Sequence, residues 1–124
     1  MLAYYDPSSN RITTKGKGPL DVATRVVLAH ELTHALQDQH FDLERLNESQ
    51  LDDGAAMAFR GLAEGDALRV EDAYVEDELT ESEQTAYDEE YAEELADSEE
   101  ATGDVPEFVS ASYGAPDALG QPFV

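Results

Sequence analysis

Residues 21–39 carry the clearest helical pattern in this 124-residue chain. Asp21 suits the N-cap position, because its carboxylate can accept a hydrogen bond from a backbone N–H of the first turn. Apolar residues then recur every three or four positions, which is the spacing of one helix face. The residues of this face are Val22, Val26, Ala29, Leu32 and Leu36. We therefore expect a helix that packs on the core through them.

The segments around this helix predict a mainly helical α+β fold. Residues 2–5 and 11–14 are β-prone and flank a run of turn formers, so they predict an N-terminal β-hairpin packed near the helix. A second helix is expected from Asp53. An interior glycine costs a helix about 1 kcal/mol relative to alanine, so Gly61 and Gly65 predict the close approach of another backbone. We expect that backbone to belong to the first helix.

The second half of the chain is strongly acidic. Half of residues 71–100 are Asp or Glu, and this segment is expected to be helical and to rest on the core by a narrow stripe. The stripe consists of Leu79, Tyr87, Tyr91 and Leu95. Beyond Thr102, three prolines predict irregular chain. Residues 1–124 are expected to form one domain that contains the acidic segment and is incomplete at its C-terminus.

Charge excludes several classes of partner. The chain has 29 Asp and Glu residues against 7 Lys and Arg residues, so its net charge is −22. Such a surface repels phosphate backbones and anionic headgroups, which excludes ordinary binding to nucleic acids or to membrane surfaces. Near 1 M salt the screening length falls to about 3 Å, so this composition is typical of a salt-adapted organism. With no membrane span and no signal peptide in the sequence, we expect a soluble protein of a high-salt cytoplasm or a hypersaline exterior.

Residues 30–34, His-Glu-Leu-Thr-His, match the H-E-x-x-H pattern in the middle of the predicted helix. Helical residues four apart lie about 6 Å apart along the axis and about 40° apart around it, so His30 and His34 can bind one metal ion. Zinc lowers the pKa of a bound water toward about 7, and Glu31 lies beside the site, where it can take that proton. The pattern therefore predicts peptide-bond hydrolysis with Glu31 as the general base.

A catalytic zinc needs a third protein ligand, and the cysteine-free sequence offers two candidates. His40 follows His34 by six residues, as in the longer pattern H-E-x-x-H-x-x-G-x-x-H, but Gln37 stands where that pattern has its glycine. A helix that continues past Gln37 would turn His40 away from the metal. Glu64 lies on the second predicted helix among small residues that permit close packing. We favour Glu64 and retain His40 as the alternative.

Further groups are needed around such a site. Metal-bound histidines are usually oriented by a second hydrogen bond, for which Asp38 and Asp66 are candidates by their spacing from His34 and Glu64. Tyr74 and Tyr113 are candidates for the group that stabilises the oxyanion, because a tyrosine hydroxyl can donate to it.

Two stretches carry a resemblance to a known family. HELTHALQDQHFDL at residues 30–43, followed by LAEGDA at residues 62–67, resembles a family of uncharacterised proteins from bacteria and archaea that look like gluzincin-type zinc metallopeptidases. The resemblance covers about residues 2–70, and members of the family continue beyond the residue that corresponds to Val124.

This resemblance implies a set of site residues. His30, His34 and Glu64 would be the zinc ligands, and Glu31 would be the general base. Gluzincins commonly carry an aspartate four residues after the ligand glutamate, whereas this chain has Leu68 there, which leaves the group that orients the histidine open.

We therefore expect a zinc metalloendopeptidase-like hydrolase with one Zn²⁺ per chain and a peptide or protein as its substrate. One alternative is a non-catalytic zinc-binding or degenerate metallopeptidase-like protein. Another is an acidic interaction module in which the motif is accidental.

Overall fold

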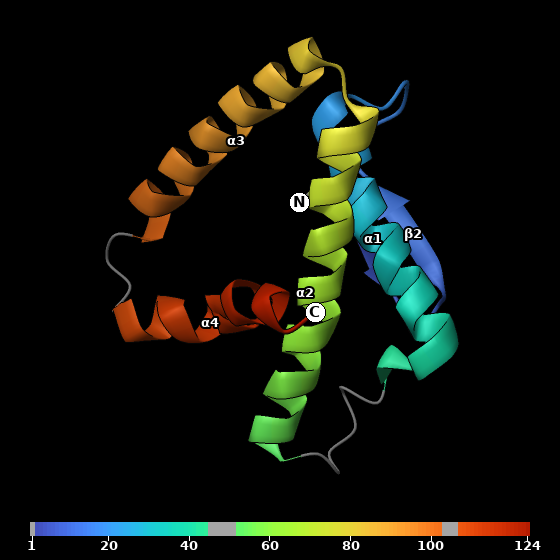
Figure 1. The fold of residues 1–124 in the computed structure, drawn as a ribbon, viewed down its shortest axis with the longest axis vertical. Helices are drawn as coiled ribbons and strands as arrows, with labels where there is room; N and C mark the ends of the chain where they lie inside the picture. Colours follow the sequence, from blue (N-terminus) through green and yellow to red (C-terminus); the bar gives the residue numbers. More distant parts are fainter. Residues whose placement is uncertain (1, 45–51, 103–106) are drawn as a thin grey trace.

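The computed structural model describes every residue except residue 1, residues 45–51 and residues 103–106. The described elements are β1 (Ala3–Asp6), β2 (Arg11–Thr14), α1 (Val22–Phe41), α2 (Asp53–Glu78), α3 (Glu81–Thr102), α4 (Glu107–Gly120) and the 3-10 helix η2 (Gln121–Phe123). The fold is mainly helical α+β, as predicted. Figure 1 shows α2 as the central element, with α1 and the strands on one side and α4 on the other.

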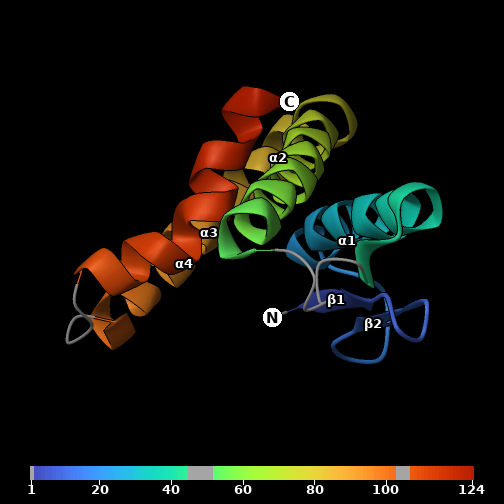
Figure 2. The same cartoon turned by 90° about the horizontal axis from the view of Figure 1, so that it is seen from below.

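The N-terminal strands form the predicted hairpin. They pair antiparallel, with Tyr4 opposite Thr13 and Tyr5 opposite Ile12. The turn between them is fixed by Asp6, whose carboxylate accepts hydrogen bonds from Ser8 and Ser9. The hairpin lies against α1 and away from α2, as the view from below shows (Figure 2).

Helix α1 begins and ends for local reasons. The Asp21 side chain accepts a 2.8 Å hydrogen bond from the backbone N–H of Thr24, which confirms the predicted N-cap. At the other end Asp42 adopts a left-handed conformation with φ of 58°, and its N–H donates to the Asp38 carbonyl. The helix therefore continues unbroken through the whole H-E-x-x-H motif.

The predicted apolar face of α1 is wrong in part. Val26 is fully buried, but Leu32 and Leu36 are 54% and 56% exposed. Polar residues share the buried face, because Thr33 and Gln37 are only 8% exposed. Polar contacts between α1 and α2, described below, determine which face of α1 packs against α2. The most apolar stripe of α1 does not.

The two interior glycines of α2 do meet another backbone, but it belongs to α4 and not to α1. A Cβ on Gly65 would overlap Gly120 and lie 2.5 Å from the Gln121 nitrogen, and a Cβ on Gly120 would overlap the Gly61 carbonyl. On a different face of α2, the fully buried Ala67 lies between Glu64 and Glu71. Helix α2 therefore packs against two helices through two separate faces.

The acidic segment is not one helix. Helix α2 extends through Glu78, and α3 begins after a turn at Leu79 and Thr80. Thr80 and Glu83 form a reciprocal capping box, in which each side chain accepts from the other residue's backbone N–H. This Thr-x-x-Glu signal is readable in the sequence and explains why the break falls where it does.

Helix α3 contacts the rest of the molecule near its start, and the narrow stripe predicted for it is only partly buried. Arg25 of α1 forms an ion pair with Glu83, and the Gln84 amide donates to the Val75 carbonyl near the end of α2. Farther along, Tyr91 and Leu95 are about half exposed. In Figure 1 the helix leans away from the α1 and α2 pair.

The irregular chain predicted beyond Thr102 is wrong for residues 107–120, which form α4 with Pro116 inside it. A proline in a helix interior removes one hydrogen bond, so the sequence argued against a helix here. The close contact of Gly120 and Pro116 with α2 stabilises the helix nonetheless. Within the described part of the chain, no helix is both long enough and apolar enough to cross a bilayer.

Candidate metal centre

The two histidines of the motif converge on one point beside α2. His30 and His34 lie one turn apart on α1, and their Nε2 atoms are 3.0 Å apart with the rings nearly perpendicular. Their side chains are 15% and 13% exposed. This convergence follows directly from the four-residue spacing of the motif in an unbroken helix.

Glu64, on α2, supplies the third candidate ligand atom. Its Oε2 lies 3.2 Å from Nε2 of His30 and 3.3 Å from Nε2 of His34. Two ligand atoms that are each 2.0–2.1 Å from a tetrahedral zinc ion lie about 3.3 Å from one another. The two imidazole nitrogens and the carboxylate oxygen therefore fit a zinc ion in spacing and in chemical type, with a fourth position left over.

A second carboxylate fixes the orientation of His30. Oε2 of Glu71 lies 3.0 Å from Nδ1 of His30, and its other oxygen accepts a 3.3 Å hydrogen bond from the Tyr87 hydroxyl of α3. Glu71 is only 19% exposed. When Nδ1 of a neutral imidazole donates its proton to a carboxylate, the lone pair is left on Nε2, which is the tautomer that a metal requires.

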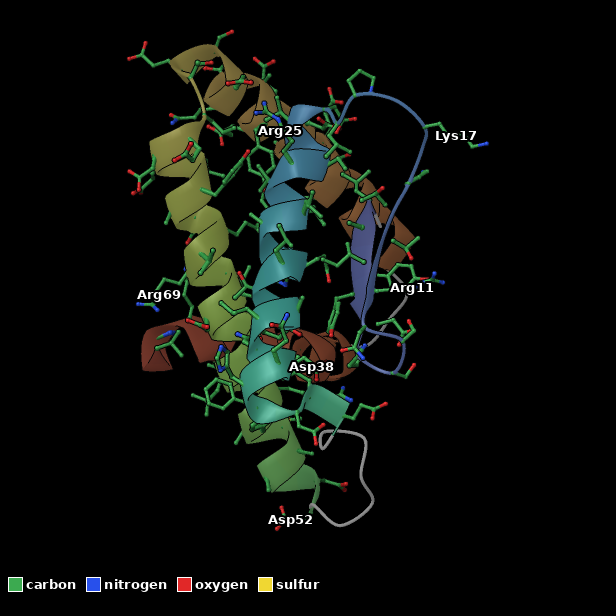
Figure 3. The ribbon with its side chains drawn as sticks, turned by 90° about the vertical axis from the view of Figure 1, so that its right-hand side faces the viewer. Arg11, Lys17, Arg25, Asp38, Asp52 and Arg69 are labelled. Atoms are coloured by element: carbon green, nitrogen blue, oxygen red, sulfur yellow. The ribbon has the colours of Figure 1, made fainter. Side chains whose placement is uncertain are left out.

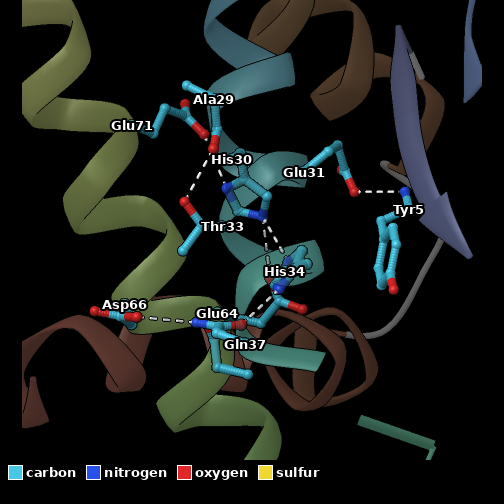
Figure 4. Close-up of polar contacts among 11 residues, drawn as sticks. Tyr5, Ala29, His30, Glu31, Thr33, His34, Gln37, Glu64, Asp66 and Glu71 are labelled. Carbon is cyan, nitrogen blue, oxygen red and sulfur yellow. Dashed lines mark hydrogen bonds and ion pairs between the residues drawn. The ribbon is translucent and has the colours of Figure 1, made fainter. Parts of the chain in front are cut away.

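The side-chain amide of Gln37 fixes the orientation of His34. Oε1 of Gln37 lies 3.0 Å from Nδ1 of His34, while the Gln37 amide nitrogen donates to the Ala63 carbonyl and to the Asp66 carboxylate at 3.0 Å each. These two acceptors determine which way the amide points, so its oxygen faces the histidine. When His34 is a neutral imidazole, Nδ1 therefore donates and Nε2 is the nitrogen left free for a metal. Figure 4 shows this ring beside His30 and Glu64.

The three converging groups shift one another's pKa values. Burial lowers the pKa of His30, but the hydrogen bonds and negative charges of Glu64 and Glu71 outweigh burial and raise it to about 10. Burial raises the pKa of Glu64, but the two histidines outweigh it and lower that pKa to about 2. The cluster therefore holds a proton strongly, and a metal ion has to displace that proton.

Glu31 occupies the opposite side of α1 from Glu71. Its Oε2 accepts a 2.7 Å hydrogen bond from the backbone N–H of Tyr5 on β1. Figure 4 shows this carboxylate turned toward the strand, beside the two imidazoles and not between them. It is not one of the three side chains whose donor atoms lie within 4.8 Å of one another. This placement suits a group next to a metal site that is not itself a ligand.

The other candidates lie elsewhere. His40 is exposed near the end of α1 and is not part of the converging group. Asp38, which Figure 3 labels, accepts hydrogen bonds from the Tyr5 hydroxyl and the Leu43 N–H, so it supports the hairpin and the end of α1. Asp66 reaches His34 only through Gln37. Tyr74 neighbours Arg25, and the side chain of Tyr113 lies outside the described residues.

The sequence interpretation missed two residues that orient the histidines. Glu71 follows Glu64 by seven residues, so it lies on the same face of α2 as Glu64. Gln37 follows His34 by three residues, so it lies on the same face of α1 as His34. That signal was available for both residues. In so acidic a chain, however, the spacing of one more glutamate carries little weight by itself.

Comparisons with known proteins add no relatives. No protein-family model, no curated protein and no solved structure matches this chain.

Proposed function

We propose that this protein is a zinc-dependent hydrolase of peptide bonds. The observation that carries the proposal is the convergence of His30, His34 and Glu64, with separations of 3.0 to 3.3 Å. Glu71 and Gln37 support it, because they fix both imidazoles in the tautomer that binds metal.

The chain's own residues would divide the chemistry among them. A zinc ion bound to the three donors would supply Lewis acidity and make water acidic enough to attack a carbonyl. Glu31 would take a proton from the attacking water and deliver it to the leaving amine. The Tyr5 N–H holds one oxygen of Glu31 and leaves the second oxygen available for this transfer.

The proposal is tested first by metal content. Purified protein in about 2 M KCl, where surface charges are screened, should contain one zinc per chain by elemental analysis. Glu64→Ala should weaken this binding, and His40→Ala should leave it unchanged. Loss of zinc in His40→Ala with retention in Glu64→Ala would contradict the ligand set.

Turnover is tested by Glu31→Gln. This variant keeps an oxygen that can accept from the Tyr5 N–H, so it should bind zinc normally while hydrolysis of casein or a peptide library is abolished. Full activity in Glu31→Gln would disprove the role of Glu31.

A non-catalytic zinc protein is the second candidate. It is favoured by one observation, namely that the Glu31 carboxylate is turned toward β1 and bonded to a backbone N–H. One zinc per chain together with no hydrolysis by the wild type would support this candidate over the first.

A further inference from the structure

Two cavities of different size and charge flank the candidate metal centre, and both reach Glu64. The larger cavity has a volume of about 740 Å³ and is lined by His30, Glu71, Asp72 and Asp88 among others. It lies on the side of α3 and α4. This volume is in the range of pockets that hold a sizeable ligand, and its charged lining is acidic.

The smaller cavity lies on the side of the hairpin. Its volume is about 160 Å³, and its lining includes His34, Tyr5, Leu43 and Arg60. A cavity of about 150 Å³ accommodates a molecule of the size of benzene, so this one has room for a single side chain. Its charged lining is one cation, Arg60, beside the candidate ligand Glu64, and apolar groups line much of the rest.

Arg60 is the unusual member of this lining. The chain has 7 Lys and Arg residues against 29 acidic residues, and Arg25 and Arg69 are paired with carboxylates. Among the described side chains, Arg60 forms no ion pair, and neither do Arg11, Lys15 and Lys17. Arg60 differs from those three because it is the Lys or Arg residue that lines the small cavity. It precedes Glu64 by four residues on α2, so the two side chains lie side by side, with Cβ atoms about 6 Å apart.

We propose that Arg60 binds the terminal carboxylate of a peptide substrate, so that the enzyme removes single residues from the C-terminus. This inference rests on the proposed function. Successive Cα atoms are about 3.8 Å apart, so a carboxylate one residue beyond a carbonyl at the metal centre falls within the reach of Arg60. The small cavity receives that last residue, and the large cavity receives the preceding part of the peptide.

Charge sets the direction of the bound peptide. The acidic lining of the large cavity repels a terminal carboxylate, whereas a guanidinium binds a carboxylate through two parallel hydrogen bonds. In the reaction, water gives its OH to the acyl carbon and its remaining proton to the amine nitrogen. The last C–N bond breaks, and one free amino acid and a shortened peptide are formed.

The experiment compares two N-acylated peptides of identical sequence, one with a free C-terminal carboxylate and the other with a carboxamide. The zinc-loaded full chain should release the last residue of the free acid at least about tenfold faster than that of the amide, since a charged hydrogen bond contributes about that factor. Arg60→Gln should lower kcat/KM for the free acid by about 10- to 100-fold and leave the amide unchanged. Arg60→Lys should recover part of the loss.

Arg11→Gln is the matched control, because Arg11 is exposed on β2 and the substitution removes the same charge. It should leave both rates unchanged. Equal cleavage of both peptides by the wild type, cleavage at internal bonds only, or an equal loss on both peptides in Arg60→Gln would overturn the proposal.

A binding measurement separates this proposal from the proposed function. The Glu31→Gln variant is titrated calorimetrically with the same two peptides, with and without Arg60→Gln. If the wild type hydrolyses neither of these peptides and neither casein nor a peptide library, the proposed function fails. The carboxylate site then still stands if the free acid binds more tightly than the amide and Arg60→Gln removes that difference. Equal affinities would overturn it.

Discussion

Nδ1 of His30 lies 3.0 Å from Oε2 of Glu71, and this contact joins the H-E-x-x-H helix to the second half of α2. The same carboxylate accepts from Tyr87 of α3, so a single residue links three helices at the candidate metal centre. Glu71 takes the orienting position for which the sequence offered Asp38 and Asp66.

Removing Glu71 should therefore weaken metal binding without abolishing it. We expect Glu71→Ala to lower zinc affinity by about 10- to 100-fold, because His30 loses the acceptor that fixes its tautomer and ring orientation. Competition with a chelator of known affinity measures this change. Glu76→Ala is the matched control, since Glu76 is exposed on the same helix, and its affinity should equal that of the wild type. Equal affinities in both variants would contradict an orienting role.

The cluster should make the stability of the metal-free protein depend on pH. The pKa of His30 is raised from 6.5 to about 10, so its contribution is complete below pH 6.5 and is lost as the pH rises toward 10. The pKa of Glu64 is lowered from 4.5 to about 2, so its contribution is complete above pH 4.5 and is lost as the pH falls toward 2. The cluster therefore stabilises the metal-free chain most between pH 4.5 and 6.5.

Thermal melts in about 1 M KCl, where the screening length is about 3 Å, test this dependence. With chelator, Tm should fall as the pH rises above 6.5, and His30→Asn should reduce that decline. His34, whose pKa is also raised, contributes the remainder. With zinc, the increase in Tm over the metal-free protein should grow over the same interval, because zinc and protons compete for the same nitrogens. A zinc effect that shrinks with rising pH would contradict the ligand assignment.

The contact between α2 and α4 should depend on its glycines. Gly65→Ala should destabilise the protein by about 1–3 kcal/mol, because the added Cβ overlaps backbone atoms that cannot move aside cheaply. Gly114→Ala is the opposite case, since a Cβ there meets nothing within 4 Å, and alanine should stabilise helix α4 by up to about 1 kcal/mol. Chemical denaturation of the three proteins gives both values. A neutral Gly65→Ala would show that the two helices do not approach this closely.

The hydrogen bond from the Tyr5 N–H to Glu31 should matter for turnover. Tyr5→Pro removes this donor, and it spares the pairing of β1 with β2 because the N–H points to Glu31 and not to β2. We expect kcat to fall by about tenfold and the zinc content to stay unchanged. The loss should be smaller than the rate enhancement of about 100-fold or more that a positioned general base contributes, because Glu31 itself is still present.

Tyr5→Ala is the control for this prediction. It loses the same ring and the same hydroxyl bond to Asp38 but keeps the N–H. Equal rates in the proline and alanine variants would show that the N–H does not position Glu31.

The sequence by itself determined the features that depend on neighbours along the chain. Asp21 caps α1, and the four-residue spacing places His30 and His34 on one face because the geometry of a helix is local. The turn residues likewise determined the hairpin. The prediction of Glu64 on a second helix gave the residue that the structure brings to both histidines.

The tertiary structure decided which face of each helix is covered and by what. Leu32 and Leu36 satisfy the helical period and still lie exposed, whereas Gln37 is buried because Ala63, Asp66 and His34 supply its hydrogen-bond partners. Pro116 predicted that residues 107–120 would not be helical, because a proline removes a hydrogen bond from a helix interior. The contact of α4 with α2 outweighs the cost of that lost hydrogen bond. Periodicity specifies that a face exists, but the identity of its neighbour depends on contacts between residues far apart in the chain. For the same reason Glu71, one acidic residue among many, became recognisable only when it lay against His30.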